Sequence, residues 1–231
     1  MPDLSGKVRL EVHARLHYPS WNWRETRFSQ EDRRANFQTL AIKGKTDKLK
    51  DRWQDLPVKD GQSTKHITNE NLVEIQYAFA GWVADQCKRS GLKRPVFIPI
   101  PNRSAVDNNL DFQTARLADM IAKRFGDRAT AWPNLRFRKP VPDSPDNRRI
   151  PPYKLYQYLH CYGRIPDGEV VLIDDVFTLG WHIAAAIKRL GIIPNKIFVG
   201  ANTIKAPVRS VLSANTTQLD IDFDTFQISR V

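Results

Sequence analysis

A buried strand that leads through two acids and a tight turn into a helix constrains this chain more than any other segment. Residues 169–173 are apolar after the first position and show no alternation, which is typical of a strand covered on both faces of a sheet. Asp174 and Asp175 follow directly, and Gly180 lies in the short turn after them. Apolar residues then recur at helical spacing over residues 181–190. The segment therefore predicts a strand whose carboxyl end faces the N-terminus of a helix.

Further strands and helices alternate along the preceding and following sequence. An apolar run over residues 95–101 predicts another buried strand, and the apolar spacing over residues 111–125 predicts a helix. Residues 129–135 and 196–200 predict two more strands. Strands that alternate with helices in this order form a parallel sheet joined by helical crossovers. We therefore predict an α/β fold, a parallel sheet flanked by helices, with its core over residues 95–205.

Three segments do not follow this alternation. Residues 136–152 are rich in Arg, Lys, Pro, Asp and Ser, which predicts an irregular loop. Residues 153–162 predict a short helix. Residues 206–231 form a tail with a weak alternation that includes Leu219 and Ile221. This tail is expected to be an added edge strand or a segment that docks onto a partner.

Residues 1–94 predict an α+β extension packed on the core. Residues 7–17 alternate between apolar and polar side chains, which predicts a half-buried, antiparallel strand. A helix is expected over residues 69–90, because apolar side chains recur there at helical spacing. Asn69 is the predicted N-cap of this helix, and Gly91 is placed to end it.

The sequence between these two elements is polar and interrupted. Tyr18, Trp21 and Trp23 alternate with arginines, as in proteins that stack the bases of single-stranded nucleic acid. The same pattern occurs in loops whose aromatic side chains anchor into a core, and we favour that interpretation. Residues 43–65 predict loops around a short helical piece near Leu49.

The positive charge of the chain is unevenly distributed. The net charge is +11, of which residues 1–94 carry +6, residues 95–168 carry +5, and residues 169–231 carry none. Basic surfaces attract nucleic acid or phosphorylated small molecules, although a solvated basic face without a specific partner fits equally well. No apolar run approaches the roughly 18 residues that cross a bilayer. The N-terminus also lacks the pattern of a signal peptide. We therefore expect a cytoplasmic protein without a membrane partner.

The turn after the acid pair has the chemistry of a sugar-phosphate site. A helix N-terminus offers backbone N–H groups and a partial positive charge to a phosphate, and Gly180 allows the backbone to approach closely. Thr178 adds a hydroxyl donor. Asp174 and Asp175 can accept hydrogen bonds from two vicinal sugar hydroxyls and can hold Mg²⁺ through water. The alternative is an ordinary strand-to-helix turn in which the acids only cap the helix.

This segment resembles the phosphate-binding motif of type I phosphoribosyltransferases. In that family an apolar strand precedes two acids, two spacer residues, Thr, a second Thr or Ser, Gly, a variable residue and a final Thr or Ser. Asp174, Asp175, Thr178 and Gly180 match this motif, whereas Leu179 and His182 replace two of its hydroxyl residues. The resemblance implies that Thr178, Leu179, Gly180, Trp181 and His182 bind the 5-phosphate of phosphoribosyl pyrophosphate (PRPP). Each missing hydroxyl donor removes about 1 kcal/mol or more, so weaker PRPP binding or a changed ligand is expected.

The resemblance extends over about residues 95–205 and points to the ComF-like branch, which is related to amidophosphoribosyltransferases. It rests on the Pro-containing strand over residues 97–101, the helix start over residues 111–118 and the Arg-rich segment from Arg136 to Arg149. It implies that pyrophosphate is bound by the loop after the first strand and by a mobile basic loop over residues 136–152. The implied pyrophosphate ligands are Asn102, Arg103, Ser104, Arg136, Arg148 and Arg149, and the implied catalytic residues of the basic loop are Arg138 and Lys139.

The resemblance implies a type I phosphoribosyltransferase fold and a transfer reaction. Ribose 5-phosphate would pass from PRPP to a nucleobase or amine with release of pyrophosphate, and Asp174 and Asp175 would act as catalytic residues that hold ribose and Mg²⁺. The alternative is a catalytically impaired protein of this fold that senses a nucleoside monophosphate or handles nucleic acid, as a homodimer or in a hetero-complex. The departures at Leu179 and His182 favour the alternative, whereas the retained acid pair favours transfer.

Overall fold

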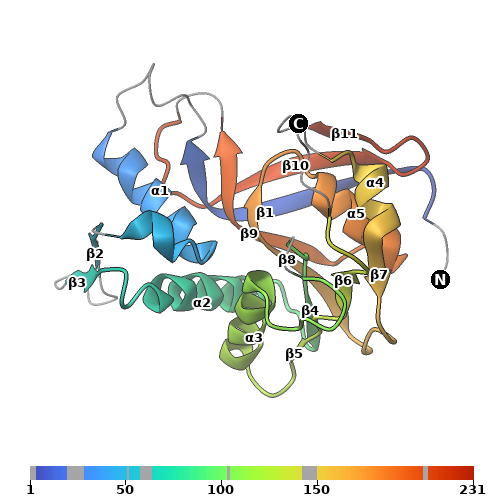
Figure 1. Ribbon diagram of the computed structural model, residues 1–231, viewed down its shortest axis with the longest axis horizontal. Helices are drawn as coiled ribbons and strands as arrows, with labels where there is room; N and C mark the ends of the chain where they lie inside the picture. The colour runs from blue at the N-terminus through green and yellow to red at the C-terminus, as the bar shows by residue number, and fades with distance from the viewer. Residues whose placement is uncertain are drawn as a thin grey trace.

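A mostly parallel sheet of seven strands forms the centre of the protein, as Figure 1 shows for this computed structural model. The structure describes residues 4–19, 29–50, 52–57, 64–102, 105–141, 150–204 and 208–231. The strands lie in the order β11 (Gln227–Arg230), β10 (Asn215–Asp222), β1 (Lys7–Pro19), β9 (Lys196–Ile204), β8 (Glu169–Phe177), β4 (Pro95–Pro99) and β5 (Thr130–Ala131). In this spatial order, each strand from β1 through β9, β8 and β4 to β5 is parallel to its neighbour. β10 is antiparallel to both β1 and β11. The predicted α/β class is therefore confirmed.

Helices cover both faces of this sheet because its central strands bury side chains on both sides. α1 (Gln30–Ile42), α2 (Val73–Arg89) and α3 (Gln113–Phe125) pack against the face that carries Phe97, Val171 and Phe198. α4 (Pro152–Tyr158) and α5 (Trp181–Leu190) pack against the other face, which carries Ile98 and Leu172. Successive strand residues point to opposite faces, so an unbroken apolar run fills both cores. Among the described residues, no helix is long and apolar enough to cross a membrane.

Short elements complete the structure outside the main sheet. A 3-10 helix, η1 (Thr46–Leu49), follows α1, and β2 (Gln54–Pro57) pairs antiparallel with β3 (Thr64–Ile67). β6 (Leu135–Phe137) pairs antiparallel with β7 (Leu159–Cys161). Loops were predicted for residues 43–65, so this strand pair corrects part of that prediction. The strand predicted over residues 129–135 is divided between β5 and β6, and the helix predicted over residues 153–162 ends at Tyr158.

The predicted helices are confirmed, with one wrong cap. α3 and α5 agree with the expected segments, and α2 lies within its expected range but begins at Val73. Leu72 is the N-cap residue of α2, so the prediction that Asn69 caps this helix is wrong. Gly91 does end α2, since it has a φ of 75° and the amide of Leu92 then reaches the Cys87 carbonyl at 3.2 Å.

Both ends of the chain belong to the central sheet. β1 pairs parallel with β9 and antiparallel with β10, so the predicted antiparallel pairing holds for one of its two neighbours. β1 therefore lies within the sheet of the predicted core. β10 and β11 form the antiparallel hairpin at the edge, as the edge-strand interpretation of the tail predicts.

Candidate functional site

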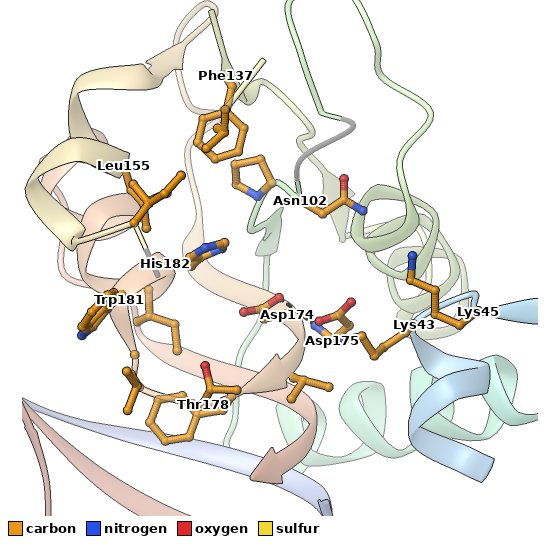
Figure 2. A pocket seen from close by; sticks show the side chains of 18 residues that line it. Lys43, Lys45, Asn102, Phe137, Leu155, Asp174, Asp175, Thr178, Trp181 and His182 are labelled. Carbon is orange, nitrogen blue, oxygen red and sulfur yellow. Dashed lines mark hydrogen bonds between the residues drawn. The ribbon is translucent and has the colours of Figure 1, made fainter. Parts of the chain in front are cut away.

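A cavity of about 630 Å³ opens at the carboxyl ends of β4 and β8, between the two helical layers. Figure 2 shows Asp174 and Asp175 between Trp181 and His182 on one side and Lys43 and Lys45 on the other. It is lined by Lys43, Lys45, Pro101, Asn102, Phe137, Val141, Ile150, Leu155, Asp174, Asp175, Val176, Phe177, Thr178, Leu179, Gly180, Trp181, His182 and Ile183. The acid pair and the complete predicted phosphate turn therefore share one cavity.

The acid pair lies inside β8 and not after it. The strand was expected to end at Ile173, but β8 continues to Phe177 because β9 remains paired beside it. Gly200 on β9 allows this close pairing, since a Cβ on it would lie 2.7 Å from the Asp175 carbonyl oxygen. The turn thus begins at Thr178, and the acids have the fixed backbone of a paired strand.

Asp174 has an unusual electrostatic environment. Its Oδ1 accepts a hydrogen bond from the Asp175 amide at 2.8 Å. Burial and the neighbouring Asp175 carboxylate raise the pKa of Asp174 well above its ordinary value, and the Lys43 ammonium opposes this only in part. A cation or hydroxyl donors placed against the pair would relieve the repulsion, so the pair favours such ligands.

These two carboxylates suit a magnesium ion that arrives with its ligand. Mg²⁺ is commonly bound by one or two carboxylates, while water and substrate oxygens complete its coordination. Over the described part of the chain, no cluster of three or more His, Cys, Asp or Glu residues provides a site for a metal ion. Asp174 and Asp175 could hold such an ion while water or substrate oxygens supply its remaining ligands.

The turn before α5 has the backbone geometry of an anion site. Gly180 is the N-cap residue of α5 with a φ of 78°, and no side chain caps this helix end. A Cβ at position 180 would lie 2.8 Å from Leu219 Cδ1 and 3.2 Å from Phe177 Cε2. The first N–H groups of a helix have no acceptor within it, and Trp181 and Ile183 in this first turn line the cavity. An anion of the size of phosphate can therefore be held by main-chain donors here.

A side chain from the C-terminal hairpin forms a hydrogen bond with the turn that precedes α5. Arg230 Nη1 donates to the carbonyl oxygens of Thr178 at 2.8 Å and Thr203 at 3.0 Å, and Nη2 donates to Asn202 Oδ1 at 2.6 Å. The guanidinium also lies 4.7 Å from the ring centroid of Phe177. One side chain from β11 thus connects the phosphate turn to the ends of β8 and β9.

An Arg230→Ala variant is expected to be less stable by about 1–2 kcal/mol, because carbonyl groups that accept from a cation lose their donor. If the turn holds a 5-phosphate, as the resemblance implies, affinity for ribose 5-phosphate should fall severalfold, since the turn loses its support. Thermal unfolding and calorimetric titration measure the two effects. Arg9→Ala is the matched control, because Arg9 bonds Asp220 on the exposed surface of the same hairpin at 2.6 Å and such pairs contribute little. Equal effects of the two variants would contradict a special role for Arg230.

The described basic residues of the predicted basic loop, Arg136, Arg138 and Lys139, contact aromatic and histidine side chains. Arg136 is buried and lies 4.4 Å from the ring centroid of Tyr162. Arg138 Nη2 lies 2.8 Å from His160 Nδ1, and the Lys139 ammonium lies over the ring of Tyr158. The pairing of β6 with β7 explains this arrangement, since it brings these side chains against residues of β7 and its flanks. None of the three lines the cavity.

The loop after β4 is described in part. Asn102 lines the cavity, as the resemblance implies for a pyrophosphate ligand. The other expected ligands, Arg103, Ser104, Arg148 and Arg149, lie outside the described residues, as do Trp21 and Trp23 of the aromatic segment.

Lys43 and Lys45 are site residues that the sequence analysis missed. They follow α1, in a segment predicted only as a polar loop. Gly44 between them has a φ of 65° and ends α1 in a tight turn. The sequence feature that could have identified these two lysines is the Lys-Gly-Lys run after a helix. This run does not reveal that the loop faces the carboxyl end of β8.

No protein-family model matches the chain, and no curated protein sequence matches it significantly.

Proposed function

We propose that the protein is a phosphoribosyltransferase of the type I class, with a cavity that binds PRPP or the 5-phosphate of a nucleotide. It would transfer ribose 5-phosphate to a nucleobase or amine and release pyrophosphate. One observation supports this most: the acid pair of β8 and the uncapped N-terminus of α5 line the same cavity. An ordinary strand-to-helix turn needs no such cavity beside two carboxylates.

Different residues of the cavity lining can bind different parts of the ligand. The turn of residues 178–182 binds the 5-phosphate through backbone N–H groups, and Asp174 and Asp175 accept hydrogen bonds from the ribose hydroxyls. Mg²⁺ held by these acids would neutralise charge on the diphosphate. Apolar side chains, among them Phe137 and Leu155, form a wall suited to a flat acceptor.

The reaction needs orientation and charge stabilisation more than a protein nucleophile. The bond between the anomeric carbon and the diphosphate oxygen breaks, the acceptor nitrogen forms the new bond, and the acceptor loses a proton. The transition state has oxocarbenium character, so fixed carboxylates and cations placed around it lower its energy. Leu179 and His182 stand where the family has hydroxyl residues, and backbone donors do not depend on these side chains.

A second candidate is a protein of the same fold that binds a nucleotide without transferring ribose. The positions of Arg138 and Lys139 favour it, because the expected catalytic cations contact His160 and Tyr158 and do not line the cavity. This candidate predicts ligand binding without turnover.

Thermal unfolding with ligands tests the proposal. PRPP with Mg²⁺ at about a hundred times its Kd is expected to stabilise the protein by about 2.7 kcal/mol. Ribose 5-phosphate and AMP test whether the 5-phosphate is sufficient, and pyrophosphate release in the presence of nucleobases or ammonia separates transferase from sensor. The absence of stabilisation by PRPP, ribose 5-phosphate and AMP would count against both candidates.

A further inference from the structure

The two lysines at the cavity are held in place by the end of α1. The amide of Lys45 donates to the Leu40 carbonyl at 2.9 Å, and that of Gly44 donates to the Ala41 carbonyl at 3.0 Å. Gln113 Nε2 from α3 also donates to the Ile42 carbonyl at 2.6 Å. The backbone that carries both lysines is therefore fixed by bonds within α1 and from α3.

Gly44 sets the path of this segment. It has a φ of 65°, and a Cβ on it would lie 2.6 Å from Gln113 Oε1. Only glycine fits this position without movement of Gln113 or of the loop. The chain thus keeps a closely packed turn, open only to glycine, between two residues that line the cavity.

Neither lysine is used in an ion pair with another described residue. Lys43 is half-buried and Lys45 is exposed, and both line the cavity across from the turn that begins α5 (Figure 2). Burial and Asp175 raise the pKa of Asp174, and the Lys43 ammonium offsets part of this rise, so its positive field reaches the acid pair. The cavity therefore has lysine ammonium groups on one side of its two carboxylates and the N-terminus of α5, with its partial positive charge, on the other.

We propose that Lys43 and Lys45 form a second anion subsite, which binds the diphosphate of PRPP across the ribose from its 5-phosphate. This inference rests on the proposed function, because that function supplies a ligand with two acidic groups. It assigns to the N-terminal extension the role that the sequence had suggested for Arg136, Arg138 and Lys139. The active site is then incomplete without residues before the first strand of the predicted core.

Two ligands that differ in the diphosphate separate this subsite from the phosphate turn. Calorimetric titrations of the full chain, with Mg²⁺ present, would compare PRPP with ribose 5-phosphate. Lys43→Met and Lys45→Met are each expected to weaken PRPP binding about tenfold or more, as the loss of a charge-assisted contact predicts. Their affinity for ribose 5-phosphate should change less than about threefold, since the turn is untouched. Lys48→Met, in the exposed η1 segment, is the matched control and should change neither.

Gly44→Ala gives a second test that keeps both charges. Because the added Cβ moves the lysines, PRPP should bind more weakly while ribose 5-phosphate binding is retained. Wild-type protein that binds both ligands, with PRPP affinity insensitive to the lysines, would overturn the subsite and leave the proposed function standing. Equal weakening of both ligands would also overturn it, because the lysines would then act without regard to the diphosphate. If the wild-type protein bound neither ligand, the proposed function would fail and the subsite with it.

Discussion

An Asp174→Asn variant is expected to unfold at a higher temperature than the wild-type protein at pH 7.5 and yet to lose its ligand. The variant retains an oxygen that accepts from the Asp175 amide, but it removes a half-buried carboxyl group whose charged form is disfavoured by burial and by the neighbouring Asp175 carboxylate. We expect a gain of about 1 kcal/mol or more, which is about 2–4 °C for a chain of this size. Affinity for PRPP with Mg²⁺ should fall at least about a hundredfold, since ribose and metal lose a charged acceptor.

The pH dependence of this gain has a defined sign. The pKa of Asp174 is raised in the folded protein, so the folded state binds more protons than the unfolded state above about pH 4. The free energy of unfolding of the wild-type protein therefore falls as the pH rises from there through the folded-state pKa. The Asp174→Asn variant lacks this pH-dependent loss of stability. The difference in the free energy of unfolding between variant and wild type should therefore grow as the pH rises to the folded-state pKa and remain constant above it.

Urea unfolding at several pH values and calorimetric titration measure the two effects. Asp85→Asn is the matched control, because Asp85 is exposed on α2 and does not line the cavity. It should change neither stability nor affinity. A less stable Asp174→Asn protein, or one that binds PRPP normally, would contradict the role assigned to Asp174.

The parts of the site that the sequence predicts are those whose signal is local. The apolar run of β8, the acids and Gly180 follow one another within a few residues, and burial on both faces of a sheet leaves a clear pattern. The end of β8 was misplaced because polar residues usually end a buried strand. Pairing with β9 and the absent side chain of Gly200 keep Asp174 in the strand, and neither is visible from the acids themselves.

The residues that were missed act over long separations in sequence. Arg230 reaches the Thr178 carbonyl because the C-terminal hairpin joins the sheet through β1, and β1 in turn needs β9 beside it. Lys43 reaches the cavity because α1 packs over the same sheet face as α3, and Gln113 of α3 bonds the Ile42 carbonyl at the end of α1. These long-range contacts do not change the hydrophobic periodicity of either contacting segment, so the sequence pattern does not reveal them. Arg136 of the predicted basic loop lies in β6, which was missed because composition alone does not distinguish a loop over a cavity from a strand that pairs with β7.

A Gly180→Ala variant is expected to lose both stability and ligand binding. The φ of 78° costs a residue with a Cβ about 1–2 kcal/mol, and the contact with Leu219 Cδ1 at 2.8 Å adds the cost of moving a fully buried side chain. We expect a total loss of about 2–4 kcal/mol, seen as a lower midpoint in urea. Ribose 5-phosphate affinity should fall at least about tenfold, because relief of the collision moves the turn whose amides hold the phosphate.

Gly91→Ala separates backbone strain from these local effects. Gly91 has a φ of 75°, nearly that of Gly180, but a Cβ on it meets nothing within 4 Å, and it lies at the end of α2 outside the cavity lining. It should lose only the strain of about 1–2 kcal/mol and bind ribose 5-phosphate normally. Adding Leu219→Ala to Gly180→Ala should restore part of the affinity, because the turn can then return to its position. If Gly180→Ala bound ribose 5-phosphate as tightly as Gly91→Ala, the phosphate would lie elsewhere, and the assignment of the turn before α5 would be wrong.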